Sequence, residues 1–225
     1  MTRQFGRLTS VRDERDKLFR MDVPHPARRL PASRSWQMRH PVLDQEDRPQ
    51  CVAYAWTAML LTTPISSSSF LKNWSTKEWC NNLYTQAQRV DGIHGSHDGT
   101  TVRAGASTLK ALGFIVNYLW GVDADTVRRY VLSRGPVVIG VDWKSGMMEP
   151  DPNGYVRVSG ASLGGHAVTI VGYSSVRAAF RVLNSWGSSW GTKGRCWVPF
   201  KGMDTLLSED GEACSAIEAP VRPVL

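Results

Sequence analysis

The hydrophobic pattern of this chain changes character near Gly113, and that change limits the folds open to it. Before Gly113, residues 51–61 are apolar on all sides, which is typical of a buried helix. After it, short β-branched and aromatic runs alternate with glycines, prolines and polar turns, as expected for strands at 114–120, 136–143, 166–173, 179–186 and 194–200. Helices that precede and stand apart from antiparallel strands predict an α+β fold, with a cleft between the two halves.

Local signals place the other helices. Ser75 followed three residues later by Glu78 is a capping-box pattern, so a helix is expected from there to about residue 90. A third helix is expected to begin after Thr100 or Thr101 and to end at Gly113, because glycine commonly follows the last helical residue. A short helix at 123–133 interrupts the expected strands.

Charge divides the chain into an arm and a body. The composition of the 225 residues, 42% hydrophobic and 21% charged, is that of an ordinary globular protein. Most of the net charge of +7 lies in residues 1–40, which hold ten Lys and Arg against four Asp and Glu. We therefore expect a basic arm over 1–40, either a solvated extension or a contact for an acidic partner, and a folded domain over 41–225.

Nucleic-acid binding is disfavoured, because no basic patch with interleaved aromatic residues follows. The sequence does not determine the oligomeric state.

The sequence shows no apolar leader and no stretch long enough to cross a bilayer, so we expect a cytoplasmic protein without membrane contact. Its cysteines lack the spacing of a zinc site, and we expect free thiols at Cys51, Cys80, Cys196 and Cys214. His94, His97 and Asp98 share a glycine-rich loop, which gives little support for a metal site. We expect no metal ion.

Cys51 stands at the start of the expected buried helix, where unpaired N–H groups and the helix dipole favour a thiolate. Taken alone, a buried core cysteine is the simpler explanation. A thiolate nucleophile also needs a base and a group that orients the base. His166 opens one expected strand and Asn184 ends another, so adjacent antiparallel strands would bring them together. A core histidine and a turn asparagine remain the alternative at this point.

Four stretches resemble, in order, motifs of the papain family of cysteine peptidases. They are the nucleophile segment DQEDRPQCVAYAW, the strand GPVVIGVDW, the histidine strand GGHAVTIVGY and the asparagine segment NSWGSSWGTKGRCWVP. The resemblance covers residues 44 to 200 and includes the chain order Cys, His, Asn. It implies a papain-like α+β fold, with a helical half over 41–115 and an antiparallel, barrel-like β half over 116–225.

The resemblance also implies roles for single residues. Cys51 would be the nucleophile, His166 would take its proton and pass it to the leaving amine, and Asn184 would orient the imidazole. The Gln45 side-chain amide and the Cys51 N–H would form the oxyanion hole, and Trp186 would cover the His–Asn hydrogen bond. A polypeptide substrate would contact Gly99, Thr100, Gly140, Gly165, Ala167 and Trp186, without a cofactor. If Glu218 pointed into the main specificity pocket, basic side chains would be preferred.

Departures from the family pattern keep alternatives open. Val52 replaces the usual tryptophan, Pro49-Gln50 replaces the usual Gly-Ser, and Arg48 stands where secreted members have a disulfide cysteine. Three hypotheses remain: a thiol peptidase, acting as an endopeptidase rather than an exopeptidase; a non-hydrolytic peptide-binding or assembly protein; and an acyl or amide transferase. The presence of all four catalytic side chains favours the first.

The arm sequence VRDERDKLF resembles the short leader of compact bacterial members of the family that lack a long prosegment. We expect the arm to pack across the body as part of the fold. The alternative is that the arm is an inhibitory segment.

Overall fold

The computed structural model describes residues 3–11, 13–14, 16, 19–21, 29–65, 74–95 and 99–218. In chain order its elements are β1 (Arg7–Leu8), β2 (Ser33–Ser35), α1 (Cys51–Leu60), α2 (Thr76–Val90), β3 (Thr100–Thr101), α3 (Val102–Ala111), β4 (Ile115–Gly121), α4 (Ala124–Ser133), β5 (Val137–Lys144), the 3₁₀ turn η3 (Ser145–Met147), β6 (Ser162–Ser174), β7 (Ala179–Leu183), β8 (Arg195–Pro199), α5 (Phe200–Ser208) and β9 (Glu212–Glu218). Three helices thus precede a strand-rich second half, which confirms the predicted α+β class.

The strands of the second half form one antiparallel sheet in the order β4-β9-β5-β6-β7-β8, with β2 paired to the long strand β6. The order has two ends, so the sheet is open and does not close into a barrel. Gly140 of β5 lies between two partners, with Ala167 of β6 on one side and Glu212 of β9 on the other.

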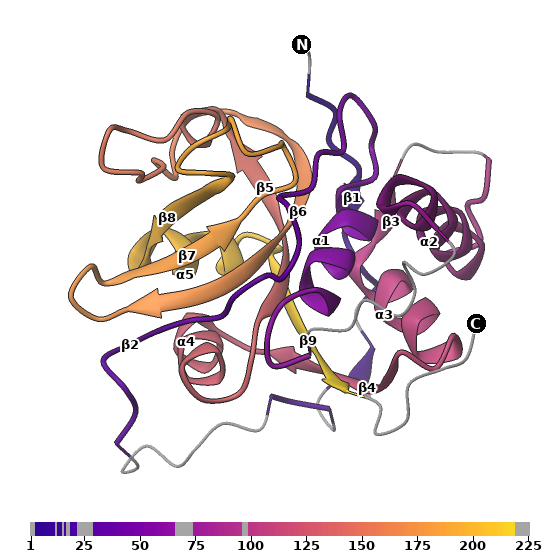
Figure 1. Cartoon of the computed structure of the whole chain (residues 1–225), viewed down its shortest axis with the longest axis horizontal. Helices are drawn as coiled ribbons and strands as arrows, with labels where there is room; N and C mark the ends of the chain where they lie inside the picture. The colour runs from indigo at the N-terminus through magenta and orange to yellow at the C-terminus, as the bar shows by residue number, and fades with distance from the viewer. Residues whose placement is uncertain are drawn as a thin grey trace.

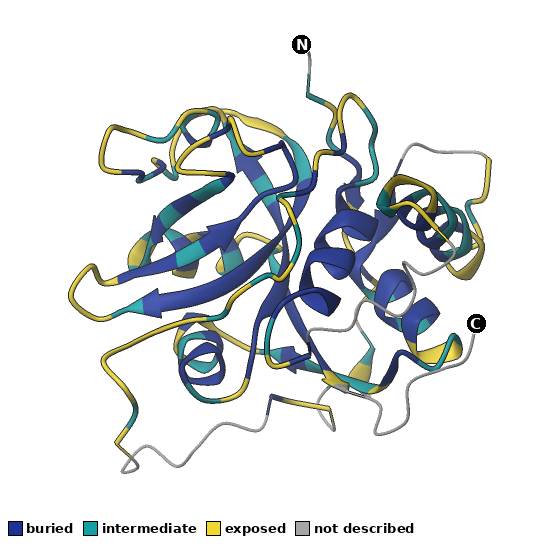
Figure 2. Ribbon diagram, in the orientation of Figure 1, coloured by how far each residue is buried: buried dark blue, intermediate teal, exposed yellow. Residues whose placement is uncertain are grey.

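Helix α1 is the centre of the molecule, between the sheet and the pair α2 and α3 (Figure 1). All ten of its residues are buried, as the sequence predicted (Figure 2). The Trp56 indole donates a 3.0 Å hydrogen bond to the Val102 carbonyl, and Thr169 of β6 donates one of 2.8 Å to the Ala55 carbonyl. These two bonds join α1 to α3 and to the sheet, and so fix the position of its first residue, Cys51.

The helix boundaries follow their caps. Ser75 and Glu78 form the predicted capping box of α2. Of the two candidates for the cap of α3, Thr101 accepts the hydrogen bond from the Ala104 N–H. The Asp123 side chain caps α4 in the same way. Sequence reasoning missed α5, β9 and the strands of the arm; the arm strands are only two and three residues long and have no periodicity of their own.

Two hydrophobic clusters form the core. One surrounds α1 and includes residues of α2, α3 and the inner face of the sheet; the other lies between the sheet, α4 and α5. Within the described part of the chain, no helix combines the length and apolarity needed to cross a membrane. All four cysteines are buried and free.

Candidate active site

Cys51 is the first residue of α1, and its side chain is fully buried. Burial raises the pKa of the thiol, although the N–H groups of Ala167, Gly6 and Val52 face the sulfur and act in the opposite direction. Of these three donors, only Val52 belongs to the start of α1; Ala167 lies in β6 and Gly6 in the arm. The effect of burial is the larger, so the net shift of the thiol pKa is upward.

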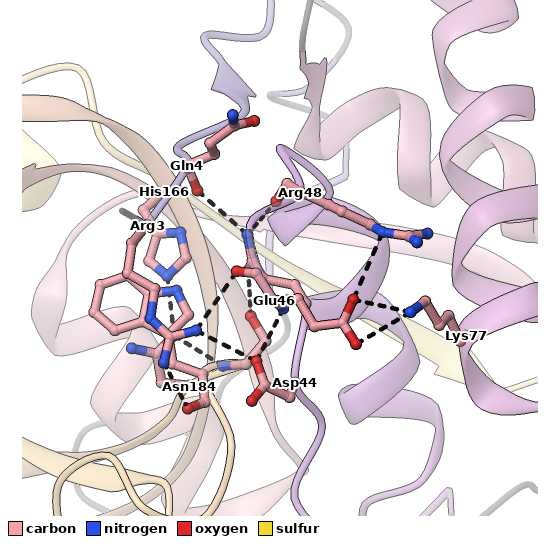
Figure 3. Close-up of polar contacts among 11 residues, drawn as sticks. Arg3, Gln4, Asp44, Glu46, Arg48, Lys77, His166 and Asn184 are labelled. Atoms are coloured by element: carbon pink, nitrogen blue, oxygen red, sulfur yellow. Dashed lines mark hydrogen bonds and ion pairs between the residues drawn. The ribbon is translucent and has the colours of Figure 1, made fainter. Parts of the chain in front are cut away.

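His166 and Asn184 meet as predicted, because β6 and β7 are neighbouring antiparallel strands. His166 Nε2 lies 2.9 Å from Asn184 Oδ1 (Figure 3). Trp186 stacks on the imidazole with its ring centroid 4.8 Å away, and Trp143 contacts the imidazole edge-on at 5.0 Å. These two indoles shield the His–Asn bond from water.

Burial lowers the pKa of His166 to about 4, although the hydrogen bond that the imidazole donates to Asn184 Oδ1 acts in the opposite direction. The positive charge of Arg3 lowers it further. The Nδ1 atom of His166 is buried and has no hydrogen-bond partner among the described residues. Burial thus disfavours the charged form of both groups, and His166 Nδ1 makes no hydrogen bond with the Cys51 thiol in this arrangement.

Gln45 is fully buried next to the start of α1. Its Nε2 donates to the Arg48 carbonyl at 2.7 Å and to the Gln4 carbonyl at 3.3 Å (Figure 3). Its Oε1 accepts a 2.6 Å hydrogen bond from the Ser185 hydroxyl. Ser185 thereby fixes which way the amide points. Sequence reasoning missed this residue, although it lies inside the quoted motif NSWG.

A segment of the arm, residues 3–8, fills the cleft between the two halves. We call it the N-terminal segment. Strand β1 pairs in parallel with β3, and the Gly6 carbonyl accepts a 2.9 Å hydrogen bond from the Thr100 N–H. The Phe5 ring contacts the His166 imidazole edge-on at 5.7 Å. Arg3 binds Asp44 at 3.3 Å (Figure 3). The arm therefore packs on the body as expected, and it does so over His166 and Gln45.

The N-terminal segment touches five of the six predicted substrate contacts, namely Gly99, Thr100, Gly140, Gly165 and Trp186. A Cβ atom on Gly99 would lie 2.7 Å from the Gly6 carbonyl oxygen, and one on Gly165 would collide with the Arg7 carbonyl. Glycine at these two positions lets a main chain approach the cleft walls closely.

The Arg7 side chain enters a pocket beside Gly140, where its Nε lies 3.3 Å from Glu212 Oε1. The resemblance to the papain family suggested Glu218 for this position. The backbone of Glu218 pairs instead with Ile115 at the far end of β9. The register of β9 thus puts Glu212 opposite Gly140.

Nothing in the described ranges groups three or more His, Cys, Asp or Glu side chains that could hold a metal ion. Of the loop considered above, His94 is exposed, while His97 and Asp98 lie outside the described residues.

A family model, papain family cysteine protease, matches residues 72–205, more than half of the chain. The match contains His166 and Asn184 and begins after Cys51. Cathepsin B-like cysteine proteinase 5 of Caenorhabditis elegans is 33% identical over 79 residues, 34% of this chain and 23% of that protein. An uncharacterized peptidase C1-like protein of Acanthamoeba polyphaga mimivirus is 36% identical over 101 residues, 42% and 32% of the two chains. The chain thus matches a third or less of the length of these relatives.

Solved structures show the same fold at low identity. Xylellain, a cysteine protease from Xylella fastidiosa, superposes with a TM-score of 0.75 at 19% identity, covering 99% of each chain. The procathepsin B S9 of Trypanosoma congolense superposes with a TM-score of 0.65 at 12% identity, covering 96% of this chain and 86% of the other.

Proposed function

The chain belongs to the papain family of cysteine proteases, and we propose that it is a cysteine peptidase that cleaves peptide bonds through Cys51. One observation carries the proposal: the site already holds a polypeptide main chain beside the thiol. The Gln4 carbonyl takes a hydrogen bond from Gln45, and the Gly6 N–H faces the Cys51 sulfur. A substrate main chain that takes the place of the segment would find the same Gln45 donor for one of its carbonyls.

In the proposed reaction, Cys51 Sγ attacks the substrate carbonyl carbon and His166 accepts the thiol proton. The oxyanion would be held by Gln45 Nε2 and the Cys51 N–H, which are aimed by Ser185 and by α1. His166 then gives the proton to the leaving amine, which departs and leaves a thioester. Water attacks the thioester, His166 takes the water's proton, and the acid product leaves as the thiol is restored.

We further propose cleavage inside polypeptides rather than at their ends. The N-terminal segment crosses the cleft and continues on both sides of Cys51, from Arg3 at Asp44 to Leu8 beside Thr101. A cleft that takes a continuous chain in both directions suits an endopeptidase. The four free cysteines fit work in a reducing compartment such as the cytoplasm.

The N-terminal segment has to leave before substrate can bind, so the described arrangement represents a covered state. This supports the inhibitory alternative for residues 3–8, while β2 of the same arm extends the sheet and supports a structural role there. Arg3 and Arg7 pair with carboxylates of the body. Part of the arm's positive charge is therefore used within the molecule.

The test uses the full chain, with Arg7→Ala to loosen the segment and Cys51→Ala to remove the nucleophile. We expect Arg7→Ala to cut an unfolded polypeptide such as reduced casein, and the double variant to be inactive. Mass spectrometry of the products with and without an added primary amine separates the hypotheses: hydrolysis gives free acids, whereas transfer gives amides. Rapid alkylation of Cys51 in Arg7→Ala, without any cleavage, would favour the non-hydrolytic alternative.

A further inference from the structure

Glu212 is a carboxylate in an unusual place, at the start of β9 and at the wall of the cleft. Only 11% of its side chain is exposed. Burial raises the pKa of Glu212, and the hydrogen bonds of Ser10 and the positive charge of Arg7 partly offset that rise. A buried carboxylate is costly unless it has hydrogen-bonding or charged partners. The partners of Glu212 therefore determine what this part of the cleft accepts.

Both of those partners come from the arm. Arg7 Nε lies 3.3 Å from Glu212 Oε1, and Ser10 provides hydrogen bonds through its side chain and backbone. Among the residues that the structure describes, no cation of the folded body pairs with Glu212. When the arm leaves the cleft, Glu212 loses these partners together.

The pocket around Arg7 is shaped for a guanidinium. Its Nη2 donates a 2.7 Å hydrogen bond to the Asp210 carbonyl, and its Nη1 lies 3.9 Å from Asp142 Oδ1. Together with the Glu212 carboxylate, these acceptors surround a side chain that is only 2% exposed. Several acceptors arranged around a planar group suit the guanidinium of arginine better than the ammonium of lysine.

Gly140 provides the space. A Cβ atom there would lie 2.8 Å from Arg7 Nε, 2.8 Å from Val102 Cγ2 and 3.1 Å from Glu212 Oε1. We name the space bounded by Val102, Gly140, Asp142, Asp210 and Glu212 the Glu212 pocket.

We propose that the Glu212 pocket selects a basic side chain, arginine above lysine, from the polypeptide substrate. In the covered state Arg7 takes that place. The inference rests on the proposed peptidase function and deepens it by naming the substrate class. An apolar side chain would leave Glu212 buried without a cation, and an acidic one would add a second negative charge.

The test compares fluorogenic peptide amides that carry Arg, Lys, Leu or Glu at each of the four positions before the reporter. The enzyme is the full chain with Arg7→Ala, so that the pocket is vacant. We expect kcat/KM for the best arginine peptide to exceed that of its leucine counterpart by about 10- to 100-fold. Adding Glu212→Gln should remove most of this ratio, because the arginine peptide loses its ionic partner and the leucine peptide no longer leaves a charge buried without a cation.

Glu209→Gln in the same background is the matched control, because Glu209 pairs with Lys144 at 2.8 Å and its side chain is 48% exposed. It should keep the arginine preference. Equal cleavage of arginine and leucine peptides, or a preference that survives Glu212→Gln, would overturn the proposal. Thermal melting shows whether each variant is folded.

A binding measurement separates this proposal from the peptidase function itself. Calorimetry on Arg7→Ala/Cys51→Ala compares the arginine and leucine peptides without any hydrolysis. Tighter binding of the arginine peptide that is lost with Glu212→Gln supports the pocket even if no peptide is cleaved. Equal binding of the two peptides refutes the pocket even if both are cleaved.

Discussion

At the scale of single residues, the hydroxyl of Ser185 orients the Gln45 amide of the proposed oxyanion hole. It donates to Gln45 Oε1, and so leaves the amide nitrogen as the group that faces the cleft. Without the hydroxyl, the amide could rotate and present an oxygen to the developing negative charge. Loss of the Ser185 hydroxyl would therefore weaken stabilisation of the transition state more than binding of the substrate.

We therefore predict that Ser185→Ala, in the Arg7→Ala background, lowers kcat by about 10- to 100-fold with little change in KM. It should also lower the free energy of unfolding by about 1 kcal/mol, because a buried hydrogen bond is lost. Ser215→Ala is the matched control: its hydroxyl is also buried and donates to the Pro136 carbonyl at 2.8 Å. The control should show the stability loss alone, and equal kcat losses in both variants would rule out the positioning role.

At the scale of elements, the two-residue strand β1 holds the cleft closed through its main chain. Gly6, just before it, is buried and passes so close to Pro49 that a Cβ atom would collide with the Pro49 carbonyl. Leu8, in contrast, is partly exposed. The fit of the N-terminal segment thus depends on the absence of a side chain at one position.

Gly6→Ala is expected to displace the segment, since overpacking costs about 1–3 kcal/mol. The alkylation rate of Cys51 by iodoacetamide should then rise about 5- to 150-fold, because 1.4 kcal/mol corresponds to a factor of ten. Peptide mapping measures the rate, with the buried Cys80 and Cys196 as internal references. In the Leu8→Ala control, Cys51 should be labelled at the wild-type rate. Unchanged labelling in Gly6→Ala would mean that the segment does not limit access to the thiol.

The comparison of sequence and structure is informative at this scale. Helix α1 and strands β6 and β7 could be predicted because apolar runs mark them, and the expected pairing of the two strands placed His166 beside Asn184. The docking of β1 against β3 could not be predicted from the sequence. A two-residue strand has no periodicity, and its partner lies far along the chain. Glu212 was also missed, since its position depends on the pairing of β9 with β5 and β4 rather than on any local pattern.

At the scale of the whole molecule, opening of the cleft is coupled to proton binding. In the covered state burial lowers the pKa of His166 to about 4. In an open, solvated cleft we expect its pKa to be near 6.5. Between these values the open state binds more protons, so the advantage of the covered state is complete above pH 6.5 and is lost as pH falls toward 4. The loss amounts to about 3 kcal/mol for this group.

The other charged groups near the segment modify this effect. Arg3 lowers the pKa of His166, in the same direction as burial. Glu212 acts in the opposite sense: burial raises its pKa, so the covered state binds its proton more readily and gains stability as pH falls. The shift at His166 is the larger of the two, so acid should favour the open cleft.

Hydrogen exchange at the Thr100 amide tests this prediction, because its N–H bonds to the Gly6 carbonyl only while the segment is in place. After correction for the intrinsic pH dependence of exchange, its protection should fall roughly 10- to 100-fold between pH 7 and pH 4.5. Leu83, in the buried face of α2, is the reference amide for global unfolding. In His166→Gln the protection of Thr100 should no longer fall with pH. A wild-type protection factor that stays constant down to pH 4.5 would show that His166 does not control the opening.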